Sequence, residues 1–534
     1  MEPELPTDPQ ALRQLVAELL AALKEKDLRI GQLSAQLDVL KRRIFGRSSE
    51  KMDPGQLALD LGAWLASQAD VASEPSPAAP PASEKETPAR KGHGRQRLPA
   101  HLHRHRTEYH PAPEDRVCRG CSAELTKIGE ETSEQLEYVP ASVFVHEHAR
   151  ILYACPHCQE NVVIGTLPVQ PIDKGLAGPG LLAHVLTSKY NDHLPLNRLE
   201  GIFQRQGVEL SRSTLCDWVG ASARLLEPLV KEMKAEILAS RKIHTDDTTV
   251  PVLDKSREST KTGRLWVYVG DPAHEHIVFD YTPDRSRDGP RDFLKGFKGY
   301  LQADAYAGYD VVYASQDVIE VACWAHARRK FFDATKTDAV RSRIALAYVR
   351  ELYEIERRGR TLGEKERRDL RVAEAKPVLD TFKSWLDAEA KKILPKSPIG
   401  EAISYAQAQW VALTRYLDDG LLEIDNNRAE RALRRVAIGR KNWMFAGSDE
   451  GGRRAAIVYS LIASCAALQI DPYVYLRDVL SRLPSTKGAD ALRLLTPKAW
   501  KASLSATLAT PATAAAAAVA ATVTAAAVAE ATAA

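Results

Sequence analysis

The stretch Ile243-His-Thr-Asp-Asp-Thr-Thr-Val-Pro-Val252 reads as a short strand that carries acidic groups where a buried strand should carry none. Ile, Thr and Val favour a pleated, half-buried surface, whereas Asp does not. A carboxylate beside a hydrophobic core is costly unless a partner neutralises it, and a divalent cation is a suitable partner. The first Asp of this stretch, Asp246, is therefore a candidate metal ligand.

Two further acidic residues stand in comparable places. Asp304 follows the apolar run Tyr300-Leu-Gln-Ala303, and Glu430 lies on a predicted helix. Two divalent ions held by carboxylates can both activate an oxygen nucleophile and stabilise a leaving oxygen, as phosphodiester chemistry requires. The intervals of 57 and 125 intervening residues mean that the three acids can meet only through the fold.

The alternative for this trio is a set of three unrelated structural roles. Asp246 would face water, Asp304 would cap a turn, and Glu430 would pair with Arg434 four residues along its helix. This alternative is competitive for any single residue. It is less so for three acids in the order strand, strand, helix.

The pattern around the trio predicts an α+β domain over 236–485. Three strands in sequence, then a helix and two more strands, fit a mixed sheet flanked by helices, as in a ribonuclease-H-like α/β core. A continuous helical pattern over 338–420 is expected to be an insertion. Asp425 is expected to cap the helix that carries Glu430, with Gly439 just beyond its end. The expected strands are 243–252, 264–270, 276–281, the run ending at Asp304, and 318–323, with a helix over 288–297.

The N-terminal region predicts a coiled coil over 9–46. Apolar residues from Leu12 to Ile44 alternate steps of three and four, with Lys26 filling one core position. This narrow seam favours a leucine zipper and therefore self-association, most simply a dimer. The alternative is an amphipathic helix that docks on its own protein. A Pro- and Ala-rich stretch over 47–97 is expected to be an extended linker.

Four of the seven cysteines predict a zinc site within 98–170. They form the pairs Cys118-Arg-Gly-Cys121 and Cys155-Pro-His-Cys158. Each pair offers two thiolates on one side of a tight knuckle, and two knuckles complete a tetrahedral site. Strands are expected over 134–140 and 143–153, as a zinc ribbon requires. A redox role is the main alternative, although two redox pairs would be redundant.

The segment 171–235 predicts two helices with a break at 206–210. Ser211 or Ser213 would cap the second helix. Helix, turn and capped helix form the outline of a helix-turn-helix, although a plain helical hairpin fits the pattern equally well. The residues 503–534 are an Ala-rich, low-complexity tail.

Bulk composition bounds the class of protein. The chain has 534 residues, of which 27% are charged and 44% apolar, which is ordinary for a soluble protein of several units. A net charge of +3 conceals basic clusters that suggest an anionic polymer as partner, although any one cluster alone fits a solvated surface. The sequence predicts neither a secretory signal nor a membrane span, so a cytoplasmic, nucleoid-associated protein is expected.

Several blocks in fixed order carry a resemblance. The chain resembles the insertion sequence 66 family of bacterial transposases, from the zipper to about Leu483. The blocks are Asp246-Asp-Thr-Thr-Val-Pro-Val252, Gly263-Arg-Leu-Trp-Val-Tyr268, Leu301-Gln-Ala-Asp-Ala-Tyr-Ala-Gly-Tyr309, Cys323-Trp-Ala-His-Ala-Arg-Arg-Lys-Phe331, Asp425-Asn-Asn-Arg-Ala-Glu-Arg431 and Gly439-Arg-Lys-Asn-Trp-Met-Phe-Ala-Gly-Ser448.

The resemblance implies a DDE transposase with a ribonuclease-H-like catalytic domain, a zinc-binding region and a leucine zipper. Its catalytic trio would be Asp246, Asp304 and Glu430. Asp246 is preferred over Asp247 because the second position of the family's acidic pair can be Glu. The implied cofactors are two Mg²⁺ or Mn²⁺ ions and a structural Zn²⁺. The implied partners are double-stranded DNA at the element ends and target, a second copy of the chain, and possible helper proteins.

Basic residues near the trio are DNA-binding candidates. His326, Arg328 and Arg329 could hold phosphates, as could Arg440 and Lys441; the alternative is a salt-bridged surface helix. A non-catalytic DNA-binding regulator with a degenerate nuclease core remains the rival function, and a nuclease without strand transfer is a third.

Overall fold

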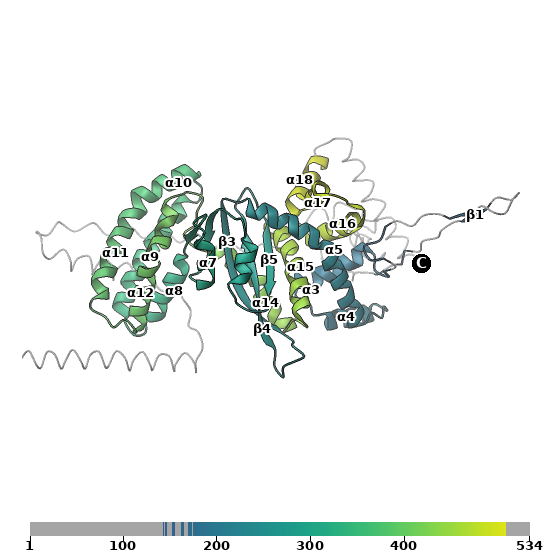
Figure 1. Cartoon of the computed structure of the whole chain (residues 1–534), viewed down its shortest axis with the longest axis horizontal. Coiled ribbons are helices and arrows are strands. Elements are labelled where there is room, and N and C mark those ends of the chain that lie inside the picture. The colour runs from purple at the N-terminus through teal and green to yellow at the C-terminus, as the bar shows by residue number, and fades with distance from the viewer. Residues whose placement is uncertain are drawn as a thin grey trace, which may run out of the picture. The chain divides into compact units, whose positions relative to one another are not determined.

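A computed structural model describes residues 143, 145–146, 152–154, 162–164, 169–173 and 175–508 (Figure 1). The predicted zipper over 9–46, the linker over 47–97 and the four cysteines of the predicted zinc site lie outside the described residues. So do the last residues of the Ala-rich tail, from 509 onward.

A five-stranded mixed sheet forms the centre of the described domain. Its order is β5-β4-β3-β6-β7. The strand β3 pairs with β4 antiparallel and with β6 parallel, and β6 pairs with β7 parallel. The predicted mixed sheet is confirmed. The strands are β3 (Lys242–Val252), β4 (Lys261–Val269), β5 (Ile277–Thr282), β6 (Gly299–Gln302) and β7 (Val318–Val321).

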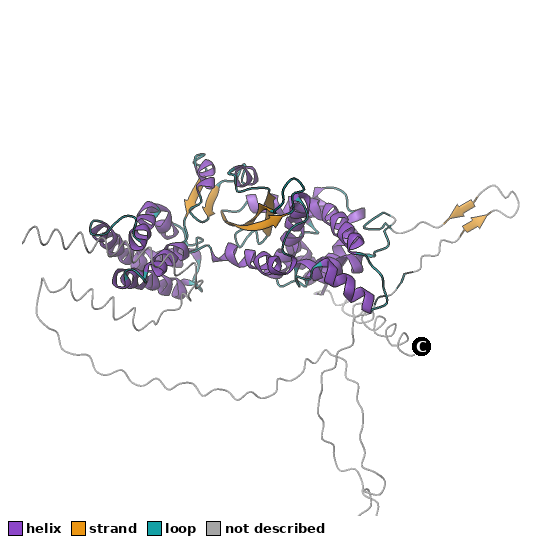
Figure 2. Cartoon of the chain, turned by 90° about the horizontal axis from the view of Figure 1, so that it is seen from below, coloured by secondary structure: helices purple, strands orange, loops and turns teal. Residues whose placement is uncertain are grey.

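Helices lie on both sides of the sheet (Figures 1 and 2). Before the sheet come α3 (Pro179–Tyr190), α4 (Leu196–Arg205) and α5 (Arg212–Leu238). Between strands lie α6 (Asp288–Phe293) and α7 (Asp310–Tyr313). After β7 come α8 (Trp324–Ala334), α9 (Ala339–Gly359), α10 (Glu364–Leu370), α11 (Lys376–Ala390), α12 (Pro398–Ala408) and α13 (Trp410–Thr414). The C-terminal helices are α14 (Asn427–Trp443), α15 (Asp449–Ala467), α16 (Pro472–Arg482), α17 (Ala489–Arg493) and α18 (Pro497–Leu508).

Two hydrophobic cores organise these helices. One core joins β3, β4 and β5 to α3, α5, α15 and α16. The other lies among α8, α9, α11 and α12 and includes the aromatic side chains Trp324, Phe382 and Tyr348. The helical pattern expected over 338–420 therefore corresponds to helices with a core of their own, next to β7.

The edge strand β5 is covered by α15. Edge strands expose unpaired N–H groups that invite association with other chains. Two of these groups are satisfied, because Ile277 N donates to Ser464 Oγ at 2.9 Å and Phe279 N donates to Ser460 Oγ at 2.8 Å. Ser460 and Ser464 lie one turn apart on α15, so this helix closes that side of the sheet.

Two local expectations for α14 were wrong. Its N-cap is Asn426, while Asp425 Oδ1 accepts a bond from Asn427 N at 3.1 Å. Gly439 lies inside the helix, which continues to Trp443. A Cβ at Gly439 would lie 2.7 Å from the Trp443 indole nitrogen and 3.0 Å from the Tyr459 hydroxyl, so packing and not helix ending explains this glycine.

The break predicted at 206–210 is confirmed, since α4 ends at Arg205 and α5 begins at Arg212. Ser211 is the N-cap of α5, and its hydroxyl accepts from Thr214 N at 3.2 Å. A short antiparallel pair, β1 (Leu152–Ala154) and β2 (Val162–Ile164), precedes these helices. Every helix in the described ranges is too short or too polar to cross a lipid bilayer.

Candidate active site

Strand register brings the two aspartates to one end of the sheet. His244 on β3 pairs with Gln302 on the parallel neighbour β6. Asp246 and Asp304 each come two residues later in the same direction along the chain. Asp246 lies within β3 and Asp304 lies two residues beyond the end of β6, so the register gives them corresponding places along two neighbouring segments, which are about 4.8 Å apart where they pair. Two segments that are far apart in the sequence are therefore neighbours in the sheet.

Helix α14 brings Glu430 to the same place. Glu430 lies in the first turn of α14, and the helix start is bonded to β3 through Asn426. The Asn426 amide nitrogen donates to Thr245 O at 2.7 Å, and its amide oxygen accepts from His244 Nδ1 at 3.0 Å. These partners immediately precede Asp246. The fully buried Asn426 therefore fixes the start of the Glu430 helix against the strand that carries Asp246.

The negative charges of Asp304 and Glu430 both act on Asp246. Burial raises the pKa of Asp246 to about 7, and the negative charges of Asp304, Asp247 and Glu430 add to this effect. Burial also raises the pKa of Asp304, while Arg285 and His326 oppose the shift. Arg285 offsets part of this negative charge, since its Nη2 lies 3.7 Å from Asp304 Oδ2, and a bound cation would offset more of it. An all-oxygen set of this kind fits a hard divalent cation.

The neighbour Asp247 has a different environment. Its carboxylate, with only 2% of the side chain exposed, accepts from Arg264 Nη1 at 2.7 Å and from Arg285 Nη2 at 2.8 Å. Asp246 Oδ1 instead accepts from the Asp247 backbone N–H at 2.8 Å. Since guanidinium groups already neutralise Asp247, Asp246 is the better placed of the two to hold a cation.

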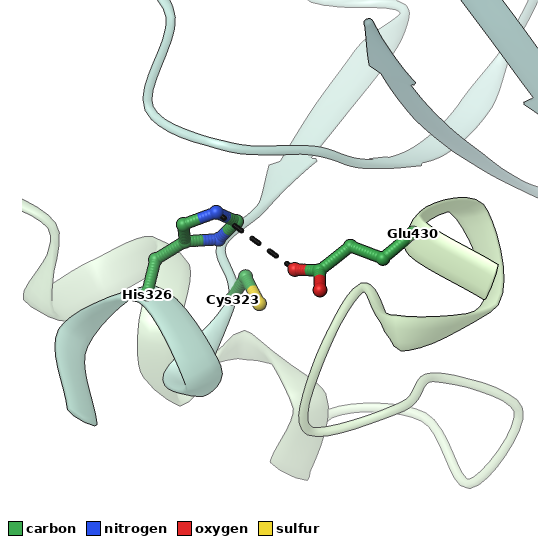
Figure 3. A group of neighbouring side chains, drawn as sticks. All are labelled: Cys323, His326 and Glu430. Carbon is green, nitrogen blue, oxygen red and sulfur yellow. Dashed lines mark ion pairs between the residues drawn. The ribbon is translucent and has the colours of Figure 1, made fainter. Parts of the chain in front are cut away.

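Cys323 and His326 lie beside Glu430 (Figure 3). His326 on α8 faces Glu430, with 3.8 Å between Nε2 and Oε1. The ligand atoms of Cys323, His326 and Glu430 all lie within 4.8 Å of one another. Burial raises the pKa of the Cys323 thiol to about 12. Its sulfur accepts from Asn426 N at 3.2 Å, which assigns Cys323 a structural role.

The predicted DNA-binding residues fall into two groups. His326, Arg328 and Arg329 line a cleft of about 330 Å³ together with Glu430, and the other lining residues are Ala325, Tyr353 and Asn427. Arg440 and Lys441 lie in the last turn of α14, more than two turns from Glu430. Arg440 Nη1 donates to Thr249 Oγ1 at 2.8 Å, so it ties the helix end to β3.

Sequence reasoning missed four residues of this site. Cys323, Asn426, Arg264 and Arg285 were not among the site residues predicted from the sequence. The spacing Cys323-x-x-His326 was a usable signal for the first, because it puts both side chains near one turn of a helix start. The roles of the others depend on partners far away in the sequence, for which the chain offers no local signal.

Comparisons with known proteins place the chain in a family of transposases. Residues 174–454 match the family described as "Transposase IS66 family", and residues 460–497 match the "IS66 C-terminal element". Residues 115–159 match the "zinc-finger binding domain of transposase IS66", and residues 32–107 match "Transposase C of IS166 homeodomain". The chain belongs to the IS66 transposase family, as its sequence motifs predicted.

Full-length relatives occur in Sinorhizobium fredii (strain NBRC 101917 / NGR234). The uncharacterized protein y4hP is 34% identical over 89% of this chain and 90% of its own length. The uncharacterized protein y4jD is 34% identical over 93% of this chain and 98% of its own length. The uncharacterized protein y4qI is 33% identical, with 90% and 91% covered.

Proposed function

We propose that this chain cuts DNA at the ends of its element and joins those ends to target DNA, with Asp246, Asp304 and Glu430 as its metal-binding carboxylates. Two observations support the proposal: the β3–β6 register gives Asp246 and Asp304 corresponding places along neighbouring strands, and the Asn426 bond to Thr245 fixes the start of the helix that carries Glu430. The strand order β5-β4-β3-β6-β7, with three antiparallel strands followed by two parallel ones, supports a ribonuclease-H-like core.

The donor set fits two Mg²⁺ or Mn²⁺ ions, which when bound would activate a water or a 3′ hydroxyl and stabilise the leaving oxygen. Asp246 and Asp304 would hold these ions from neighbouring strands, and Glu430 would complete the set from α14. Arg328 and Arg329 line the cleft beside Glu430, where they could bind phosphates of the DNA strand. His326 lines the same cleft, with its Nε2 3.8 Å from Glu430 Oε1.

The predicted domain organisation completes this proposal. We infer a structural Zn²⁺ at Cys118, Cys121, Cys155 and Cys158. The second Cys pair falls in the connection between β1 and β2, which pair antiparallel with Ala154 opposite Val162, as expected beside a zinc knuckle. The zipper over 9–46 would join two copies, so that both ends of an element are held together.

The test uses DNA that carries the inverted repeats flanking the gene. Wild-type protein is expected to nick this DNA only with Mg²⁺ or Mn²⁺ and to transfer the 3′ end to a plasmid target. Asp304→Asn should lower cleavage at least 100-fold while retaining DNA binding in a mobility-shift assay. Asp317→Asn, a change of the same kind at a surface ion pair with Lys298, should cleave normally.

Three outcomes would separate the alternatives. If the intact protein binds the repeats but does not cleave them with either ion, the regulator is favoured. Hydrolysis products without joined products would favour a nuclease that lacks strand transfer. Equal cleavage by Asp304→Asn and wild type would remove this carboxylate from the site.

A further inference from the structure

Helix α14 ends in a strained turn at Met444. The central residue has φ 61° and ψ −48°, and Phe445 N donates to Trp443 O at 2.7 Å. This is a γ-turn with a positive central φ, which is rare and unfavourable for a residue that has a side chain. Strain of this kind persists only where the surrounding structure imposes it.

The surrounding structure holds the turn on both sides. Before it, Trp443 packs against the core that contains the sheet. After it, Ala446 N donates to Pro251 O at 2.8 Å, and Leu253 N donates to Ala446 O at 2.9 Å. The turn is thereby fixed to the far end of β3, where the β3–β4 hairpin begins.

Large apolar side chains project from this place into solvent. Met444 is 64% exposed, Leu253 45% and Phe445 40%. Burial of such side chains is favourable, so three of them at one fixed edge indicate a surface that another molecule covers.

The charges around this edge indicate which molecule covers it. Seven basic residues lie on the β3–β4 loop, the last turn of α14 and the start of α15, against four acidic ones. The basic residues are Lys255, Arg257, Lys261, Arg440, Lys441, Arg453 and Arg454, and the acidic residues are Asp254, Glu258, Asp449 and Glu450. Lys261 pairs with Asp449 at 2.7 Å, so part of this charge is neutralised within the surface. Exposed apolar side chains beside a surface of net positive charge match DNA, whose phosphates bind basic side chains while an apolar wedge enters the base stack.

We propose that Met444 and Phe445, with Leu253 beside them, form a wedge that enters DNA between base pairs and unstacks them. The proposal rests on the proposed function, since it concerns the same DNA that is cut. The rigid γ-turn presents the wedge already formed, so no ordering of the loop opposes its insertion. Unstacking a step would bend the duplex and let more of it contact the basic surface.

The fold also predicts where the wedge acts. From Asp246 to Val252 is six residues of strand, or about 20 Å. From Glu430 to Met444 is fourteen residues of helix, or about 21 Å. A duplex that follows α14 advances about 3.4 Å per base pair, so the distorted step should lie about six base pairs from the cut phosphate.

The experiment measures unstacking without cleavage. Full-length Asp304→Asn protein is bound to inverted-repeat DNA with flanking sequence, and thymine oxidation by permanganate is mapped along both strands. One hyper-reactive step, at least fivefold above free DNA and about six base pairs from the cut position, is expected. Adding Met444→Gly and Phe445→Ala should lower that signal to the level of free DNA. Because Gly favours positive φ, Met444→Gly should not lower the thermal midpoint, whereas Phe445→Ala, at a side chain that is 40% exposed, should lower it slightly.

A matched control and a rescue sharpen the result. Leu494→Ala removes a side chain that is also 64% exposed, and it should leave the signal intact. In the cleavage-competent background, the wedge variant should cut a fully paired end at least tenfold more slowly. An end with a mismatch at the wedged step should restore its rate.

Equal permanganate reactivity in the wedge variant and its parent would overturn the proposal. So would a loss of self-association in sedimentation with unchanged DNA reactivity, because the edge would then bind another copy of the chain. Failure of the proposed function looks different, since wild-type protein would then cut no end of either kind.

Discussion

Replacing Asp246 by Asn tests the electrostatics of the candidate site without any DNA. Burial, together with three neighbouring carboxylates, raises the pKa of Asp246 from its ordinary 3.8 to about 7. The carboxyl group therefore takes up a proton on folding between about pH 4 and pH 7. Its contribution to stability is present at low pH and is lost as the pH rises through 7. Asn has no charge to bury, so the variant should lack this loss.

The size of the effect follows from the same shift. The difference between 3.8 and about 7, at about 1.4 kcal/mol for each pH unit, corresponds to about 4 kcal/mol. The Asp246 side chain keeps some contact with solvent, which roughly halves this figure to about 2 kcal/mol. Metal-free Asp246→Asn should therefore unfold about 5 °C above wild type at pH 8 and within about 1 °C of it at pH 4.

The assay is thermal unfolding of both proteins from pH 4 to pH 8 without added Mg²⁺. The difference between the two curves isolates Asp246 from other titrating groups. Adding Mg²⁺ at pH 8 should stabilise wild type, because the ion neutralises the gathered carboxylates, and should have a smaller effect on the variant. If the two midpoints ran parallel over the whole pH range, Asp246 would not be a buried group surrounded by other carboxylates.

Further substitutions test the supports of the site. Asn426→Ala leaves two buried partners on β3 unsatisfied, at about 1–3 kcal/mol each. Urea unfolding should therefore show a free energy of unfolding that is lower by about 2–6 kcal/mol. Asn426→Asp should recover only part of this loss. Arg264→Gln removes a 2.7 Å bond to the nearly buried Asp247 and should cost about 2 kcal/mol in urea unfolding at pH 7. Cys155→Ser should lower bound zinc measured by atomic absorption, whereas Cys216→Ser, at an exposed free cysteine, should leave it unchanged.

The positions of the strands could be predicted because β-branched and apolar runs mark them. All five strands of the sheet overlap their predicted ranges, and β3 differs from its prediction by one residue. Asp246 and Asp304 stood out because each interrupts or ends such a run. The helix expected over 288–297 ends at Phe293, since Gly296 adopts φ 85°. The pattern of apolar and β-branched residues therefore predicted where strands and helices lie better than it predicted where they end.

The supports of the site could not be predicted because they depend on distant contacts. Asn426 was part of a recognised motif, yet its bonds reach residues 181 and 182 positions away. Gly439 fitted a helix end by type, whereas packing against Trp443 and Tyr459 explains it. In both cases the residue type allows several roles, and only the fold selects one.

More than one hundred residues, most of them in the helical region, separate β7 from Glu430. The position of Glu430 relative to the sheet therefore depends on how this region is attached at its two ends. The entry and exit of this region are bonded to each other. Trp324 N donates to Ile424 O at 3.1 Å, and Ala322 N donates to Ala412 O at 3.0 Å.

The returning segment is also tied to the sheet. The fully buried Lys242 donates to Leu421 O at 2.8 Å, and Gln302 donates to Asp425 O at 3.0 Å. Since β3 and β6 themselves hold both ends of this segment, changes within α9 to α12 need not move the start of α14. The helical region can therefore vary in length or sequence while the three carboxylates keep their geometry, as long as the bonds at its entry and exit remain.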